Sequence, residues 1–223
     1  MSRKKLIRFE HNAENEKIIQ AEKPIYDTIK GKWHSEYFKN DKPIVLELAC
    51  GRGEYTIALA QKYPDKNFIG VDLKGARIWK GATQADKLGL NNVAFLRAII
   101  ENLDRFFEKG EVAEIWLIHP DPHPKSRDEK RRLTSTRFLN LYRSISEENV
   151  LVRLKTDNPQ LYEFTLEVLK DEKISELEHT SDLYHSPLLA DHLDIQNQPI
   201  KTRYEKKFTE LGFTINYVKF RLL

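Results

Sequence analysis

The sequence predicts an α/β fold with one mostly parallel sheet, and three observations carry that prediction. Short apolar runs alternate with segments of helical period five times along the chain. The apolar runs are continuous, which is typical of strands buried on both faces of a sheet. Residues 213–223 instead alternate apolar and polar side chains, which indicates a final antiparallel strand. A chain of 223 residues with 40% hydrophobic side chains is long enough for one domain with a sizeable core.

The first two strand–helix units have clear boundaries. Residues 43–49, PIVLELA, form an apolar run that ends in a glycine turn and predict a buried strand. Residues 54–64 have helical period and stop at a proline, which cannot continue a helix. Residues 67–73 predict a second strand. Residues 76–90 predict a second helix, because their apolar side chains return at helical spacing and a glycine closes the segment.

The same alternation continues to the last helix. It comprises residues 92–98 (strand), 103–109 (short helix), 114–120 (strand), 129–146 (helix) and 149–156 (strand). The helix predicted at residues 159–171 follows two candidate caps, Asp157 and Asn158, and has Pro159 in its first turn. About 30 less regular residues come next. Ligands of such sheets bind beyond the carboxyl ends of the strands, so the residues that follow each strand are the candidates for function.

The two ends of the N-terminal region have different character. Residues 1–23 are polar and basic with scattered apolar positions, and we expect a flexible or loosely docked arm. Residues 24–39 are rich in aromatic side chains and predict a helix or irregular cap on the body of the protein. We therefore expect one domain over residues 24–223.

Composition excludes several classes of protein. The formal net charge is only +3, so a basic face matters more than the total. Cys50 is the single cysteine, so no intrachain disulfide is possible and a zinc cluster is implausible. We expect no metal and a reducing cytoplasm. No window approaches 18 apolar residues, so we expect no membrane helix.

Two acidic residues and a glycine loop follow the first two strands. Gly51 and Gly53 allow a close approach of the backbone to a ligand. A dinucleotide fingerprint needs a further glycine at the position of Thr56, so NAD and FAD are disfavoured. Glu47 lies within an apolar strand, where a carboxylate needs a partner, either a ligand ammonium or backbone donors of the loop. Asp72 ends the next strand and suits the ribose hydroxyls of an adenosine-type ligand, or a helix cap.

The fourth strand ends in the stretch HPDPHPKSRDEKRR, residues 119–132. Asp121 lies between two prolines, which restrict the backbone that holds it. The basic run after it suits phosphate groups, although a solvated helix face is the usual role of such a run. Asp157 ends the fifth strand and suits a helix cap, a functional role, or both.

Together these motifs resemble the bacterial tRNA (guanine-N7-)-methyltransferase family. The resemblance rests on the Glu47 and glycine-loop segment with Asp72, on HPDPHPKSRDEKRR, on KTDN at 155–158 and on TRYEKKF at 202–208. It runs from about residue 43 to the end of the sequence. It implies a Rossmann-like class I methyltransferase with a seven-stranded sheet, helices on both faces and an antiparallel C-terminal strand.

The resemblance also implies a cofactor and residue roles. S-adenosylmethionine would be the methyl donor, and a guanine N7 in tRNA the acceptor, at position 46 of the variable loop. The cofactor site would comprise Glu47, Gly51, Gly53, Asp72, Ala98, Ile99 and Asp121, with Asp121 also the catalytic aspartate. The substrate site would comprise Lys125, Asp157, Thr202, Arg203, Tyr204 and Glu205. Phosphate contacts would come from Arg127, Lys130, Arg131 and Arg132.

The sequence departs from the family pattern at several positions. The family commonly has glycine at Ala49, an acid at Ala98, and the motif Phe-Pro-Asp-Pro-Trp where this chain has His119 and His123. Without the acid, the adenine must be held by backbone groups or by a neighbour such as Glu101.

Chemistry agrees with the resemblance, and some alternatives stay open. Guanine N7 carries an in-plane lone pair, so methyl transfer needs alignment and stabilisation of positive charge on the ring rather than a strong base. Asp121, Asp157 or Glu205 would suit that carboxylate role, and we favour Asp121. The alternatives are a methyltransferase that acts on another RNA or a small molecule, and a non-catalytic RNA-binding protein on the same fold. The protein is expected to be a monomer or a homodimer.

Overall fold

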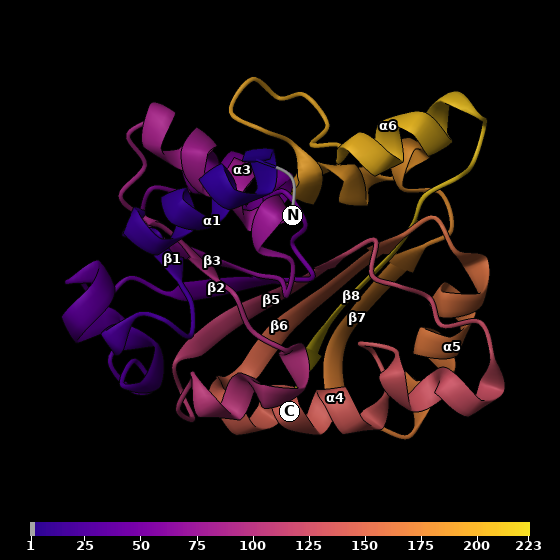
Figure 1. The fold of residues 1–223 in the computed structure, drawn as a ribbon. Helices are drawn as coiled ribbons and strands as arrows, with labels where there is room; N and C mark the ends of the chain where they lie inside the picture. Colours follow the sequence, from indigo (N-terminus) through magenta and orange to yellow (C-terminus); the bar gives the residue numbers. More distant parts are fainter. Residues whose placement is uncertain (1–2) are drawn as a thin grey trace.

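The computed structural model describes residues 3–223, with side chains from residue 7 onward. One eight-stranded sheet crosses the molecule, and helices cover both of its faces (Figure 1). The strand order is β1-β4-β3-β2-β5-β6-β8-β7. Every pair of neighbours is parallel except the two pairs made by β8. The predicted fold class and antiparallel C-terminal strand are confirmed, but the sheet has one strand more than the seven we expected.

The strands are β1 (Ile18–Ile19), β2 (Ile44–Leu48), β3 (Asn67–Val71), β4 (Val93–Leu96), β5 (Val112–Ile118), β6 (Ser146–Thr156), β7 (Ile174–Thr180) and β8 (Asn216–Leu222). The α-helices are α1 (Arg3–Glu14), α2 (Glu54–Lys62), α3 (Gly75–Lys87), α4 (Thr136–Ile145), α5 (Pro159–Lys170) and α6 (Arg203–Glu210). Short 3₁₀ turns lie at Pro24–Asp27, Ile100–Arg105, Ser126–Arg131, Leu183–His185 and Pro187–His192, and a π-helix lies at Trp33–Phe38.

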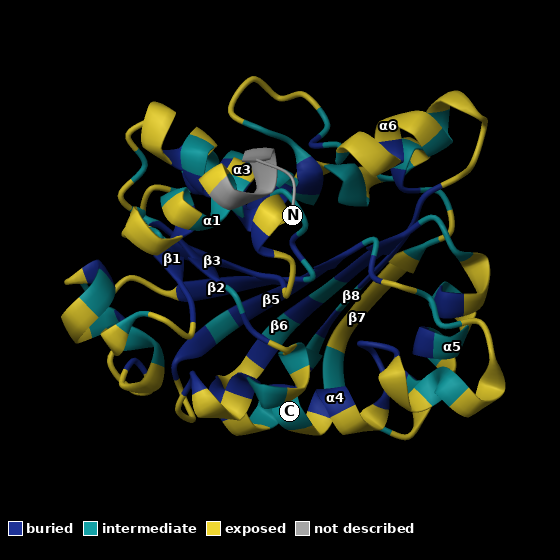
Figure 2. Cartoon of the chain, viewed as in Figure 1, coloured by how far each residue is buried: buried dark blue, intermediate teal, exposed yellow. Residues whose placement is uncertain are grey.

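The core consists of two apolar layers, one on each face of the sheet. Successive side chains of a strand point to opposite faces, so Leu46 and Val45 of β2 belong to different layers. The layer of Leu46 packs against α4 and α5, and the layer of Val45 packs against α2 and α3. Burial on both faces explains why the sequences of β2, β3 and β4 are almost continuous apolar runs, and these three strands are buried at every position (Figure 2).

The extra strand comes from the region predicted to be a flexible arm. Ile18 and Ile19 lie opposite Phe95 and Leu96 of β4, and both isoleucines are fully buried. Helix α1 packs on α3, where the side chain of Asn12 donates to the Gly75 carbonyl at 3.0 Å. Two adjacent isoleucines bury enough apolar surface to hold an edge strand. Residues 3–23 therefore form part of the folded body, whereas residues 1–2 lie outside the described residues.

Two further predicted boundaries were wrong. The helix expected over residues 129–146 begins at Thr136, because Arg132 to Ser135 take a separate buried path below the preceding 3₁₀ turn. The short helix expected over residues 103–109 is a 3₁₀ turn at Ile100–Arg105.

The less regular segment covers the polar half of one sheet face. Arg153 and Lys155 of β6 point to the face that α2 and α3 cover elsewhere. Arg153 donates to Glu114 at 2.6 Å and forms an ion pair with Asp191 at 2.5 Å. The residues between β7 and β8, which include α6, lie over this part of the sheet (Figure 1). They cover the buried charges and also contribute Leu183 and Ile215 to a small apolar cluster with Tyr217 of β8.

Candidate active site at the carboxyl edge of the sheet

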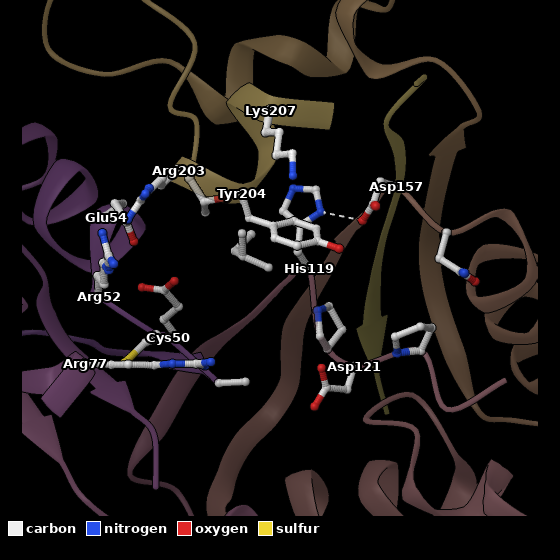
Figure 3. Close-up of a pocket in the computed structure, with 18 residues that line it drawn as sticks. Cys50, Arg52, Glu54, Arg77, His119, Asp121, Asp157, Arg203, Tyr204 and Lys207 are labelled. Carbon is white, nitrogen blue, oxygen red and sulfur yellow. Dashed lines mark hydrogen bonds and ion pairs between the residues drawn. The ribbon is translucent and has the colours of Figure 1, made fainter. Parts of the chain in front are cut away.

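A pocket of about 550 Å³ opens at the carboxyl edge of the sheet (Figure 3). Its walls come from the loop after β2, the loop after β5, the residues after β6, and α6. β2, β5 and β6 are parallel neighbours, so their carboxyl ends bring these loops together. The volume lies in the range of small-molecule sites.

Glu47 lies on the pocket wall and is almost completely buried. Its Oε2 accepts from the backbone N–H of Thr56 at 2.7 Å and from the Thr56 hydroxyl. Thr56 is in the first turn of α2, whose early N–H groups lack partners in the helix. The other oxygen, Oε1, makes no hydrogen bond among the described residues. Burial raises the pKa of Glu47 to about 8, although the bonds from Thr56 oppose the shift.

The loop after β2 is held by Asp72, which ends β3. The two Asp72 carboxylate oxygens accept from the backbone N–H of Gly51 at 3.0 Å and of Lys74 at 2.7 Å. Three loop residues have positive φ: Ala49 at 58°, Gly51 at 60° and Gly53 at 71°. A Cβ at Gly53 would lie 2.6 Å from the ring of Phe95, so glycine is required there for space as well as conformation. Ala49 adopts the left-handed conformation although it has a side chain.

The loop after β5 carries Asp121 to the pocket wall. The N–H of His119 donates to the Lys155 carbonyl at 2.8 Å, and then a φ of 47° at His119 turns the chain out of the sheet. The carboxylate of Asp121 is exposed and makes no hydrogen bond or ion pair with any described residue. Figure 3 shows it across the pocket from Arg203 and Tyr204 of α6. A free carboxylate on a proline-braced loop is available to a ligand.

Beneath α6 lies a cluster of four ionisable groups, Lys155, Glu205, His119 and Asp157, which we call the buried polar cluster. Glu205 is fully buried, and its Oε1 lies 2.6 Å from the Lys155 ammonium. Its Oε2 lies 3.3 Å from His119 Nε2, close enough for an ion pair but not aligned for a hydrogen bond. His119 Nδ1 lies 3.0 Å from Asp157 Oδ1 (Figure 3). The cluster therefore connects α6 to the ends of β5 and β6.

The charges of the cluster support one another. Burial lowers the pKa of Lys155 to about 8, and the nearby Glu205 carboxylate partly opposes this. Burial alone would raise the pKa of Glu205, but His119 and Lys155 together lower it to about 2. Burial also lowers the pKa of His119, yet Asp157 and Glu205 outweigh it, so the net shift is upward. Glu205 is consequently ionised and Lys155 protonated at neutral pH.

The structure brings many of the predicted site residues to this pocket. Those on its wall are Glu47, Gly51, Asp121, Asp157, Thr202, Arg203 and Tyr204. Those away from the wall are Gly53, Asp72, Ala98, Ile99, Lys125, Glu205, Arg127, Lys130, Arg131 and Arg132. Thr202 is the N-cap of α6, since its hydroxyl accepts from the Glu205 N–H at 3.1 Å. Glu205 itself points into the protein and has no exposed surface for a substrate.

The basic run after Asp121 divides into two parts. Lys125, Arg127, Lys130 and Arg131 are exposed around the 3₁₀ turn Ser126–Arg131. Arg132 is buried and donates to backbone carbonyls of the Asp121 loop. The prediction that Arg132 contacts a phosphate was therefore wrong, because its guanidinium is already engaged inside the protein.

Several residues near the pocket were not predicted from the sequence. Arg52, Arg77 and Lys207 line its wall and add positive charge. Leu73 is 57% exposed and directly follows Asp72, and the exposed Ile99 comes after β4, the parallel neighbour of β3. Two features of the sequence could have identified such residues: Arg52 is a basic residue within the glycine loop, and Leu73 is an apolar residue directly after the acid Asp72.

Comparisons with known proteins agree on one family. A family model described as "Putative methyltransferase" matches residues 41–217. A tRNA (guanine-N(7)-)-methyltransferase of Cytophaga hutchinsonii is 50% identical over 225 aligned residues, which cover 100% of this chain and 99% of the relative. The protein of the same name from Bacteroides fragilis is 46% identical and covers 100% of this chain and 87% of its own length.

Solved structures agree with the fold. A 16S rRNA (adenine(1408)-N(1))-methyltransferase variant from Catenulisporales acidiphilia, solved with its cosubstrate SAM, superposes with a TM-score of 0.61. It is 14% identical, and the match covers 86% of this chain and 91% of that one.

Residues 3–223 contain no helix with the length and apolar character of a membrane span. Nor does the described part of the chain gather three or more His, Cys, Asp or Glu side chains in a metal-binding group.

The buried polar cluster predicts the effect of Glu205→Gln. The substitution keeps the size of the side chain but leaves the Lys155 ammonium buried without its counter-charge. We expect the free energy of unfolding, measured by urea titration at neutral pH, to fall by about 3 kcal/mol. Glu210→Gln, on the exposed surface of the same helix, is the control and should change it by less than about 0.5 kcal/mol. Equal effects of the two substitutions would contradict a stabilising role for the cluster.

The raised pKa of Glu47 predicts how the free energy of unfolding changes with pH. The direction is opposite to that expected for an ordinary carboxylate in an ion pair. Its pKa rises from 4.5 to about 8 on folding, so the native state holds the proton more tightly. The stability this contributes is fully present below about pH 4.5 and is lost as the pH rises through about 8. Glu47→Gln keeps the acceptor for Thr56 and cannot ionise. We expect the unfolding free energy of Glu47→Gln, relative to that of the wild type, to increase as the pH rises from about 4.5 to about 8. If the two proteins instead give parallel curves of unfolding free energy against pH, the pKa of Glu47 does not change on folding.

Proposed function

The chain belongs to the family of tRNA (guanine-N(7)-)-methyltransferases, and on that premise we propose which of its residues carry out the reaction. The protein transfers a methyl group from S-adenosylmethionine to N7 of a guanine in tRNA. The target guanine is at position 46 of the variable loop, and the protein acts in the cytoplasm as a monomer or a homodimer. One observation supports the residue assignment above all: two carboxylates with free oxygens, Glu47 and Asp121, face one pocket at the carboxyl edge of the sheet.

The residues around the pocket fit S-adenosylmethionine. When bound, this cofactor supplies a methyl group on a cationic sulfonium. Glu47 Oε1, which makes no hydrogen bond among the described residues, would accept from the ammonium of its methionine part, and that positive charge would offset the burial that raises the pKa of Glu47. Arg52, on the same wall, would pair with the methionine carboxylate. The sequence predicted the first of these contacts but not the second.

Residues after β3 and β4 would hold the adenosine part. Asp72 would accept from the ribose hydroxyls, since each carboxylate oxygen keeps a lone pair beside its backbone bond. Leu73 and Ile99 expose apolar surface after neighbouring strands and would pack on the adenine. Ala98 is buried and contributes only its backbone, so apolar contact takes over from the acid common in the family.

Asp121 stabilises the guanine during methyl transfer. N7 attacks with an in-plane lone pair, so no residue has to remove a proton first. Positive charge then develops on the purine ring, and an exposed carboxylate with no protein partner lies free to face it. The same carboxylate can accept from the N1–H and amino group of guanine, an edge that adenine lacks. Prolines on both sides limit the movement of the carboxylate and so favour alignment.

Helix α6 provides the other wall for the base. The ring of Tyr204 is 55% exposed and is tilted against Phe208 at a centroid distance of 4.3 Å. An exposed aromatic ring above a pocket suits stacking on a base taken out of its RNA stack. Arg203 lies beside it, and Asp157 keeps one oxygen free after bonding His119. Thr202 and Glu205 act through the position of α6 rather than by touching the RNA.

The exposed part of the basic run binds phosphates around the target base. Lys125, Arg127, Lys130 and Arg131 project from the turn that follows the Asp121 loop, next to the pocket. Such contacts supply affinity and orientation without reading sequence.

Asp121→Asn tests the role of the free carboxylate. We expect single-turnover methylation of unmodified tRNA to slow by about 10²-fold to 10³-fold, because the amide cannot stabilise a cationic ring. Borohydride and aniline cleavage, which cuts at N7-methylguanosine, locates the product. Asp128→Asn, in the neighbouring turn, is the control and should keep the wild-type rate. Calorimetric titration with S-adenosylhomocysteine should give unchanged affinity. Loss of that affinity together with the rate would instead assign Asp121 to cofactor binding.

The phosphate contacts predict a change in salt dependence. We expect Arg127→Gln with Lys130→Gln to weaken tRNA binding and to reduce the slope of log K against log salt by about 0.7 to 0.9 for each residue. Lys170→Gln is the control, because α5 starts at the carboxyl edge and ends, with Lys170, at the opposite edge of the sheet. Filter binding across a salt series measures both the tRNA affinity and its slope against salt concentration. An unchanged slope in the double variant would place the RNA elsewhere.

A further inference from the structure

The backbone that carries Asp121 has almost no support of its own. Among the described residues, no backbone–backbone hydrogen bond reaches residues 120–124. Prolines at 120, 122 and 124 remove three N–H donors from this stretch, and His119 and His123 both have positive φ, at 47° and 43°. The prolines stiffen the chain locally but do not fix the loop to the rest of the protein.

One side chain supplies the missing attachment. Arg132 Nε lies 3.1 Å from the Pro122 carbonyl oxygen and 3.2 Å from that of His123, and Nη2 lies 3.1 Å from the latter. These are the hydrogen bonds that the structure shows for residues 120–124. The guanidinium thus holds two consecutive carbonyls directly after Asp121, and a planar fork of donors is suited to such a task.

Arg132 is itself fixed from several sides. Its side chain is only 7% exposed, and the guanidinium carbon lies 4.3 Å from the centre of the Phe164 ring in α5. Its Nη1 lies 3.5 Å from Glu129. The adjacent Arg131, by contrast, is 62% exposed, and its one ion pair with a described residue is to Asp128, at 3.7 Å. Two arginines next to each other in one basic run therefore have different environments, which permits a matched comparison.

We propose that Arg132 is a positioning residue for methyl transfer, which holds the Pro122–His123 carbonyls so that Asp121 faces the guanine. The proposal rests on the role of Asp121 proposed above. A loop that loses this attachment moves its carboxylate relative to the base, and a displacement of about 1 Å can cost about a hundredfold in rate. Because Arg132 directly follows the exposed basic turn, the segment that meets the RNA phosphates also supports the catalytic loop.

Arg132→Lys separates this role from phosphate binding. Lysine keeps the positive charge but has no fork to span two carbonyls. We expect kcat for tRNA methylation to fall by about tenfold to a hundredfold, with unchanged tRNA affinity, salt slope and S-adenosylhomocysteine affinity. Arg131→Gln is the matched control and should lower tRNA affinity and salt slope while it keeps kcat. A wild-type kcat in Arg132→Lys, or a loss of salt slope equal to that of Arg131→Gln, would overturn the proposal.

A double-mutant cycle distinguishes positioning from general weakening of the fold. If Arg132 acts through Asp121, Asp121→Asn with Arg132→Lys should be no slower than Asp121→Asn alone. If the rate of the double variant falls by the product of the two single reductions, the proposal is overturned.

Phe164→Leu, which removes the ring beneath the guanidinium, should also lower kcat, by a smaller factor. This variant provides the test if Arg132→Lys folds poorly. An unchanged kcat in Phe164→Leu would then count against the proposal. Full activity of Asp121→Asn alone would instead refute the proposed role of Asp121.

Discussion

The pocket depends on a carboxylate that no ligand can reach. Glu205 is the one buried side chain of α6 among residues 203–210, and the rest of that helix lies over the surface. Its two oxygens face Lys155 of β6 and His119 at the end of β5. One group therefore fixes the helix that presents Tyr204 and the residue from which the Asp121 loop departs. A buried ion pair adds little net stability compared with apolar packing, but it allows only a narrow range of geometries. The cluster therefore gives two walls of the pocket defined positions relative to each other.

Much of this arrangement could be predicted from residue patterns. The continuous apolar runs identified the parallel strands, because burial on both faces leaves no polar alternation. The rule that ligands bind beyond the carboxyl ends then selected Glu47, Asp121 and Asp157, which the structure places around one pocket. The glycine loop was recognisable since only a few residues tolerate positive φ. In each case the determining interactions lie within one strand–loop–helix unit, so the local sequence contains the information.

The features that could not be predicted depend on partners far away in the chain. Strand β1 is two residues long, and its assignment requires knowledge of β4. Arg132 resembles its basic neighbours in sequence, and only the position of the Asp121 loop and of Phe164 explains its burial. Glu205 likewise looked like a substrate contact. One local signal was available: Arg153 and Lys155 alternate with apolar residues in the second half of β6, which indicates a polar layer on one face of that strand.

The place of β8 has a consequence for how the molecule assembles. β7 precedes β8 in the chain, yet β8 lies between β6 and β7 in the sheet. Until β8 inserts, β6 has an open edge and β7 has no partner. The segment that delivers β8 also delivers α6, whose carboxylate neutralises the Lys155 ammonium beside that open edge. Closure of the sheet and completion of the pocket therefore depend on the same C-terminal segment, and a chain in which β8 is unpaired also lacks the wall that α6 forms.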